Sequence, residues 1–306
     1  MLLYVGRRLL QMVPLLLVIS FVVFVALEMA PGDPVTLLLG QNASPQAVAE
    51  LRAELGLDRP LFLQYFSFIT EAVQGDLGLS YRSGREVSFE LARTVEVSAT
   101  LALTAMILAV LVGVTVGIVA AVKQYTFIDT ITRVGVLAMV SLPVFWLAIL
   151  MIIGFAVKWP IFPAFGWGTY GHLVLPAIAL STYPLAVIAR LTRSSMLEVM
   201  SSDYVRTARA AGLPERTVVM KYALKNALVP VMTVIGLQFG GLIGGAVLTE
   251  TVFGIPGIGR LIVTAIEGRD YPVVRGAVLL GTVVFVLINL LVDMLYKWAD
   301  PRQRGV

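Results

Sequence analysis

The feature that most restricts the fold of this chain is a series of six long apolar runs. They lie near residues 9–30, 97–122, 134–157, 173–189, 227–249 and 273–295. About 20 helical residues cross a hydrocarbon core roughly 30 Å thick, and a spanning segment must satisfy its own backbone hydrogen bonds. We therefore predict an all-α membrane protein with six transmembrane helices. The fourth run is short and contains Pro176 and Pro184, which a membrane helix tolerates when its neighbours satisfy the freed carbonyl groups.

Composition supports this class of protein and excludes others. Hydrophobic residues make up 58% of the 306 residues and charged residues 14%, which leaves too little polar surface to solubilise a globular domain. The chain has no cysteine, and its single histidine is His172. Disulfides, Cys/His zinc sites and Cys/His catalytic pairs therefore cannot be built from this chain alone. We predict no catalytic, metal-binding or cofactor-binding residues in it.

The distribution of basic residues predicts that both termini are cytoplasmic. An even number of spans puts both termini on one side, and cytoplasmic loops are enriched in Lys and Arg. The side with the termini carries 14 of the 23 basic residues and six of the 19 acids. Its basic residues are Arg7, Arg8, Lys123, Arg133, Arg190, Arg193, Arg206, Arg209, Arg216, Lys221, Lys225, Lys297, Arg302 and Arg304.

A cleavable secretory signal is the competing interpretation of residues 1–30, because a basic start precedes an apolar run there. The run is longer than the roughly 7–15 residues of a signal's apolar region. Glu28 also lies where cleavage after Ala30 would require a small residue. We therefore favour a retained transmembrane helix and expect Glu28 to be paired or to reach the interface. A proton relay is the alternative role for Glu28.

The loop between the first two spans is expected to form small ordered structure on the outer face. Residues 31–34, Pro-Gly-Asp-Pro, end the first helix with a rigid turn. Ser44 and Pro45 are the residue types of a helix N-cap and first position. The aromatic-rich segment 61–73 is predicted to lie at the interface or against the helices. Packing is one interpretation of this region, and a docking platform for an extracytoplasmic protein is the other.

The loop after the fifth span, residues 250–261, combines helix breakers with apolar residues. Pro256 and three glycines, at 254, 257 and 259, break any helix, yet the residues between them resist solvent. We expect this segment to re-enter the membrane or to cap the outer mouth of a cavity. A simple turn is the alternative.

The inward loop at residues 190–226 is much longer than a helix connection needs. Asp203 can cap a short helix over 204–211, Gly212 can end it in a left-handed conformation, and Pro214 can start the next helix. The short helix is therefore predicted to lie along the cytosolic face and to dock into a partner's groove. Small residues at 208 and 210–212 allow close approach, and arginines supply charge-assisted bonds. A solvated basic loop is the alternative.

This inward loop resembles the EAA-type coupling loop of ABC importer permeases in the dipeptide, oligopeptide and nickel branch. The resemblance lies in residues 203–213, DYVRTARAAGL, and 223–230, ALKNALVP. The general importer pattern begins Glu-Ala-Ala, whereas this chain has Arg206-Thr207-Ala208, and Ala211 stands where peptide permeases often carry lysine. Further segments resemble the B-type subunit of that branch: Arg7-Arg8 with 31–34, 55–60 with 75–78, and 250–261.

The resemblance implies a type I ABC importer permease fold in a bacterial or archaeal cytoplasmic (inner) membrane. It implies an N-terminal transmembrane helix at 1–30, an extracytoplasmic region at 31–95, and a five-helix permease core at 96–300 with the coupling loop 190–226. The implied partners are a second homologous permease subunit, two cytosolic ATPase subunits, an extracytoplasmic solute-binding protein and membrane lipid, but no nucleic acid. The sequence has no Gly-x-x-x-x-Gly-Lys-Ser/Thr loop, so ATP and Mg are expected on the ATPases.

Three groups of site residues follow from this resemblance and from the pattern of the spans. ATPase coupling is expected at Asp203, Tyr204, Arg206, Thr207, Ala208, Arg209, Ala210, Ala211 and Gly212. The translocation path or subunit interface is expected at Gln238, Gly240, Gly241, Gly244 and Gly245, whose glycines have the spacing of close helix contacts. An outer gate or binding-protein docking site is expected at Glu250, Phe253, Pro256, Gly257, Gly259 and Arg260.

Two rival classes fit the sequence poorly. An ion-driven carrier normally places acids, histidines or broken helices near the bilayer midplane, where these spans hold almost none. An intramembrane hydrolase needs a nucleophile and a base, and the chain has one histidine and no Gly-x-Ser-x-Gly. Dipeptides or short oligopeptides are the expected substrates of the importer. Glutathione, nickel chelates and oligosaccharides remain alternatives.

Overall fold

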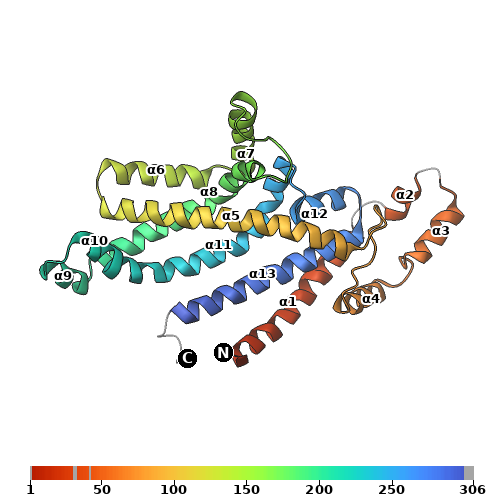
Figure 1. The fold of residues 1–306 in the computed structure, drawn as a ribbon. Coiled ribbons are helices and arrows are strands. Elements are labelled where there is room, and N and C mark those ends of the chain that lie inside the picture. Colours follow the sequence, from red (N-terminus) through yellow and green to blue (C-terminus); the bar gives the residue numbers. More distant parts are fainter. Residues whose placement is uncertain (1, 30–32, 41–42, 300–306) are drawn as a thin grey trace. The chain divides into compact units, whose positions relative to one another are not determined.

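The computed structural model of the chain describes residues 2–29, 33–40 and 43–299, and this part is almost entirely helical (Figure 1). Its elements are α1 (Leu2–Glu28), α2 (Pro34–Leu39), α3 (Pro45–Glu54), α4 (Leu61–Val73), α5 (Val87–Val122), α6 (Phe127–Ser141), α7 (Val144–Ile152), the π-helix η1 (Ile153–Lys158), α8 (Tyr170–Met200), α9 (Asp203–Ala210), α10 (Glu215–Thr217), the π-helix η2 (Val218–Ala223), α11 (Leu224–Phe253), α12 (Ile258–Glu267) and α13 (Tyr271–Ala299).

The described helices confirm the prediction of an all-α protein with several spans. Five of them are long and apolar enough to cross a bilayer, and two further helix pairs, each joined at a bend, raise the number of candidate spans to as many as seven. The predicted number of six lies within this range. The cytoplasmic position of the termini stays a prediction from the distribution of basic residues.

The third predicted span, 134–157, is wrong as a single straight helix. The chain forms α6 and α7 instead, and the two segments differ in direction by 100°. The break lies at Pro143, which has no backbone N–H to donate and which disfavours helical geometry at the residue before it. Leu142 is accordingly extended, with φ −88° and ψ 126°. After the bend, α7 continues into the π-helix η1.

The fourth predicted span, 173–189, is too short. Helix α8 extends from Tyr170 to Met200 and includes Pro176 and Pro184. Buried residues make up 67% of its apolar window, a larger share than in the windows of the other four long helices. Contacts with α6, α7 and α11 surround this helix. Tertiary packing therefore stabilises a helix that two prolines would weaken in isolation.

Two glycines on α5 allow its close approach to α8. A β-carbon added at Gly113 would lie 2.9 Å from the carbonyl oxygen of Leu185, and one added at Gly117 would lie 2.7 Å from that of Ala189. Both distances are below van der Waals contact, and both carbonyl oxygens belong to the backbone of α8, which cannot move aside as a flexible side chain would. Gly113 and Gly117 have the four-residue spacing of close helix contacts, and the structure places them in such a contact.

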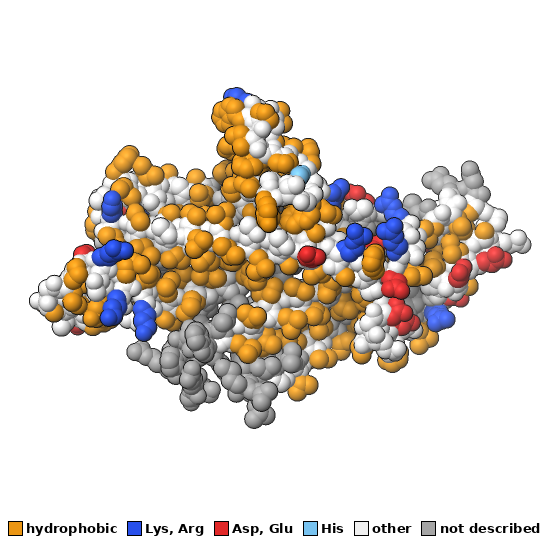
Figure 2. Space-filling view, viewed as in Figure 1, with side chains coloured by type: hydrophobic (Ala, Val, Ile, Leu, Met, Phe, Trp, Pro, Cys, Tyr) orange, Lys and Arg blue, Asp and Glu red, His pale blue; other side chains and the backbone are white. Residues whose placement is uncertain are grey.

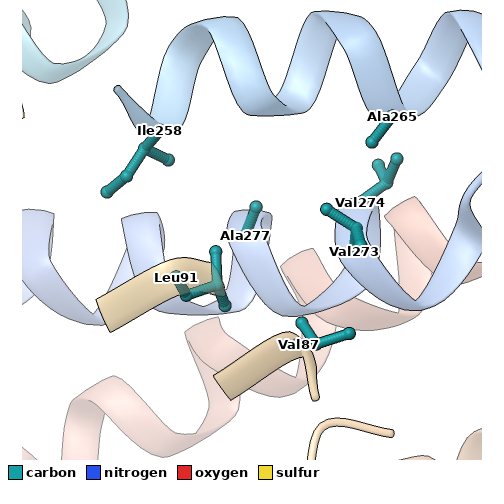
Figure 3. Packing of buried hydrophobic residues seen from close by; sticks show 7 residues of the cluster. All are labelled: Val87, Leu91, Ile258, Ala265, Val273, Val274 and Ala277. Atoms are coloured by element: carbon teal, nitrogen blue, oxygen red, sulfur yellow. The ribbon is translucent and has the colours of Figure 1, made fainter. Parts of the chain in front are cut away.

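The chain divides into two compact units, one made of residues 1–98 and 256–286 and the other of 99–255 and 287–306. In the first unit, the starts of α5 and α13 pack with α12 around a small apolar core (Figure 3). Its buried residues are Val87, Leu91, Ile258, Ala265, Val273, Val274 and Ala277. This core ties segments together that lie far apart in the sequence.

The outer segments of the first unit are also ordered. As predicted, Ser44 caps α3 by accepting a hydrogen bond from the N–H of Ala47, 3.2 Å away. Helix α4 lies against α1, where the Tyr65 hydroxyl donates to the carbonyl oxygen of Leu17 at 2.8 Å. The buried Asp270 carboxylate accepts a hydrogen bond from the N–H of Tyr81 at 3.0 Å. Desolvation raises the pKa of Tyr81.

Glu28, the acid near the outer end of α1, is paired as expected. Its carboxylate lies 3.9 Å from the guanidinium of Arg275 on α13. That guanidinium is buried and stacks 3.8 Å from the centre of the Phe24 ring. An ion pair backed by an aromatic ring gives this acid a structural role at the end of the span.

We expect Gly117→Ala to destabilise the fold. Its β-carbon would collide with the backbone of α8, and such overpacking costs about 1–3 kcal/mol. Thermal unfolding of the detergent-solubilised protein measures the effect as a lower Tm. The matched control is Gly135→Ala on α6, where a β-carbon meets no atom within 4 Å and alanine favours the helix. Equal Tm values for the two variants would contradict the close approach of α5 and α8.

Candidate functional site

The inward loop folds into the predicted short helix, α9, followed by a sharp turn. Gly212 ends this segment with φ +76°, which confirms the left-handed glycine. Glu215 begins α10 directly after Pro214. The predicted cap is wrong, because Asp203 is the first helical residue and Ser202 occupies the N-cap position. Asp203 therefore lies in the first turn, where its negative carboxylate interacts favourably with the positive end of the helix dipole.

One face of α9 packs within the chain. Val205 and Ala208 are buried against Val218 at the start of η2. The Tyr204 hydroxyl accepts a hydrogen bond of 2.7 Å from the side chain of Asn226 on α11. Ala208 was expected to face a partner, but it belongs to this internal contact. The helix is thereby fixed to the chain that connects α8 with α11.

The other face of α9 and the turn after it are open to solvent. The exposed site residues are Asp203, Tyr204, Arg206, Thr207, Arg209, Ala210, Ala211 and Gly212. Lys and Arg side chains gather over α9, α10 and the start of α11 (Figure 2). This surface combines small residues with positive charge, as a helix that docks into a groove requires.

The two arginines of α9 have different surroundings. Arg209 forms a two-pronged ion pair with Glu215, with N–O distances of 2.7 and 3.1 Å, and this hydrogen-bonded carboxylate raises the pKa of Arg209. Arg206 is 3.8 Å from Asp203, and 71% of its side chain is exposed. Arg209 therefore holds the turn after α9 in place, and Arg206 is the arginine more available to a partner.

A second apolar cluster lies at the ends of the long helices that are next to α9. Its buried residues are Ala121, Met196, Val219, Ala223 and Ala227. They come from α5, α8, η2 and α11, so one core joins the helix before α9 to the helix after it. A displacement of α9 is therefore resisted by packing on both sides.

A buried ion pair between α6 and α8 was not predicted from the sequence. The Asp129 carboxylate on α6 is 0% exposed and accepts two hydrogen bonds from Arg193 on α8, at 2.7 and 2.9 Å. It also accepts a hydrogen bond from the N–H of Tyr125, which has a positive φ of 63°. The available signal was that Asp129 is the single acid between the second and third apolar runs.

The predicted path residues lie on α11. Gln238 is partly buried, and within the described part of the chain its side-chain N–H group has no hydrogen-bond partner. Gly240 is buried, whereas Gly241 is exposed with open space beside it. The surroundings of Gly244 and Gly245 lie outside the described residues. A polar amide inside a span, such as that of Gln238, is consistent with a translocation path or a subunit interface. This role stays a prediction.

The predicted outer-gate residues are divided between the two units. Glu250 and Phe253 are buried in the last turn of α11, so the helix continues further than expected and ends at Gly254, with φ +65°. In the other unit, Pro256 and Arg260 are exposed and Gly257 and Gly259 are buried. The helix break is confirmed, and the gating role stays a prediction.

Comparison with solved structures shows that this chain shares its fold with chains of two ABC transporters. An inward-facing structure of the MetNI methionine ABC transporter matches 69% of this chain and 97% of its own chain, with a TM-score of 0.60 and 19% identity. The crystal structure of an amino acid ABC transporter with histidines matches 70% of this chain and 94% of its own, with a TM-score of 0.51 and 14% identity. At these identities, the likeness establishes the fold alone.

Residues 113–305 match the family described as binding-protein-dependent transport system inner membrane component, and residues 1–104 match its N-terminal component. The dipeptide transport system permease protein DppB of Alkalihalophilus pseudofirmus is 44% identical, over 99% of both chains. The glutathione transport system permease protein GsiC of Escherichia coli is also 44% identical over 99% of both. The chain therefore belongs to the inner-membrane permeases of binding-protein-dependent ABC importers.

We expect Val205→Ala to loosen α9 from η2. Each buried methyl group lost costs about 0.8 kcal/mol, plus the cavity left behind. Trypsin should then cut more quickly after Arg206 and Arg209. Thr207→Ala, an exposed position on the same helix, is the control and should not change the cleavage rate. Equal rates for the two variants would contradict the packing of α9 on η2.

Proposed function

We propose that this permease subunit imports dipeptides or short oligopeptides that an extracytoplasmic solute-binding protein delivers. The observation that carries the substrate class is the 44% identity, over 99% of both chains, to a dipeptide transport permease. Glutathione, itself a short peptide, is the second candidate, because a glutathione transport permease is equally similar. Both relatives favour a ligand with peptide chemistry over a nickel chelate or an oligosaccharide.

The importer requires further subunits. We infer that this chain forms one half of the membrane channel with a second homologous permease, and that two cytosolic ATPases bind and hydrolyse ATP with Mg. The absence of a phosphate-binding loop from the sequence supports this division of labour. The excess of basic residues on the side of the termini supports a cytosolic position for α9, where ATPases are accessible.

Helix α9 is the proposed contact with an ATPase. Its exposed face carries Arg206 and the small residues 210–212, which suit a groove with an acidic rim. Its buried face, through Val205 and Ala208, is bound to η2. A pull on the docked helix would therefore act on α8 and α11 together. Alternation between outward and inward access follows if the two permease subunits rock against each other.

The assignment is tested with the complex purified through this subunit and reconstituted in proteoliposomes. We expect a second permease and two ATPases to copurify, and ATP-dependent uptake of radiolabelled alanyl-alanine when the binding protein is added. Radiolabelled glutathione in a parallel experiment separates the two substrate candidates. Transport by a homodimer of this chain without ATPases would refute the proposal.

We expect Gly212→Asp to reduce uptake to background while membrane insertion is retained. The residue has a left-handed conformation, in which a β-carbon costs about 1–2 kcal/mol, and the new carboxylate changes the charge of the docking surface. The measurements are uptake of the transported peptide and the amount of the subunit in the membrane. Gly84→Asp is the matched control: Gly84 has φ +67°, has open space around it and lies in the outer region. Normal uptake by Gly212→Asp would remove the coupling role of α9.

A further inference from the structure

The buried ion pair of Asp129 and Arg193 connects helices α6 and α8, which continue into different parts of the structure. Arg193 lies on the last part of α8, which ends at Met200, three residues before α9 begins. Asp129 lies in the first turn of α6, which leads to the bend at Pro143. The pair therefore joins α8, which leads to the proposed coupling site on α9, to the bent segment α6–α7.

The geometry of this pair is tightly determined. Nε and Nη2 of Arg193 donate to different oxygens of the same carboxylate, at 2.7 and 2.9 Å, so the guanidinium and carboxylate planes are aligned. The carboxylate also accepts from the N–H of Tyr125 and thereby holds the turn between α5 and α6. A non-glycine residue with φ +63° persists where surrounding contacts over-determine it. A shift of Arg193 would therefore move the start of α6.

A second arginine near the same carboxylate has weaker geometry. Arg133 lies one turn further along α6, 3.6 Å from Asp129, and 55% of its side chain is exposed. It cannot connect α6 to another helix through this contact, because both residues belong to α6. Arg193 and Arg133 thus allow a comparison in which one cation links two helices and the other does not.

We infer that Asp129 and Arg193 are positioning residues that transmit a displacement of α9 through α8 to the bent segment α6–α7. The inference rests on the proposed function, in which an ATPase displaces α9. In this arrangement the ion pair does not build the ATPase site or the substrate path. It makes the bent segment follow the coupling helix, so its loss separates ATP hydrolysis from transport.

The decisive variant replaces both partners by uncharged amides, Asp129→Asn with Arg193→Gln. Removing one partner would leave a buried charge unpaired, whereas removing both avoids that penalty and preserves the fold better. We expect the reconstituted complex to assemble in normal amounts and to hydrolyse ATP, while uptake per ATP falls about fivefold or more, the range of typical coupling between distant sites. Arg133→Gln should keep the wild-type ratio of uptake to ATP hydrolysis.

A covalent link provides a rescue that does not depend on charge. The chain has no cysteine, so Asp129→Cys with Arg193→Cys introduces the two thiols of this subunit. A short thiol-specific cross-linker that joins them should restore uptake per ATP in the same sample, and a reducing agent should abolish it again if the linker is cleavable. Uptake per ATP of the cysteine variant before and after cross-linking also tests the inference if the amide variant assembles poorly.

Two results would overturn the inference: a wild-type ratio of uptake to ATP hydrolysis in the amide variant, or no change in this ratio on cross-linking the two cysteines. Failure of the proposed coupling role of α9 gives a different pattern, because Gly212→Asp would then leave uptake intact. Loss of uptake in Gly212→Asp together with normal uptake per ATP in the amide variant would overturn only the proposed role of the ion pair.

Discussion

The structure depends on one constraint, that a backbone inside hydrocarbon must satisfy its own hydrogen bonds. Long helices meet this constraint, and the described chain breaks them at residues that cannot continue a helix or that readily leave it, such as Pro143 and Gly254. Lipid hydrocarbon is also as apolar as the side chains, so no hydrophobic driving force brings the helices together and close packing must hold them. Gly113 and Gly117 supply that packing by letting α5 approach the backbone of α8.

Helix α8 is the element on which the membrane-embedded part of the second unit is organised. It contacts α6, α7 and α11, and it receives the glycine face of α5. Through Arg193 it forms a buried ion pair with Asp129 on α6, and its C-terminal end leads directly into α9. Helix α8 tolerates two prolines because it is surrounded by other helices. A force applied at its C-terminal end is therefore distributed over the helices that it contacts.

The candidate coupling site combines a fixed face with an open one. Val205 and Ala208 pack α9 against Val218 of η2. The remaining surface of α9 presents Arg206 and small residues to solvent. A docking helix needs both properties, because a partner must reach it and its motion must be passed on. The membership of the chain among inner-membrane ABC importer permeases agrees with this arrangement, and short-peptide import is the function proposed for it.

The sequence by itself determined the helical class, most of the spans, the short inward helix and its glycine end, because these depend on local periodicity and backbone preference. Tertiary structure decided the 100° bend at Pro143, the full length of α8, the burial of Ala208 and the pairing of Asp129 with Arg193. Proline in a membrane helix can either bend the chain or be accommodated, and the choice depends on neighbouring helices. Likewise, a charge pattern along one chain cannot specify which residues 64 positions apart will meet.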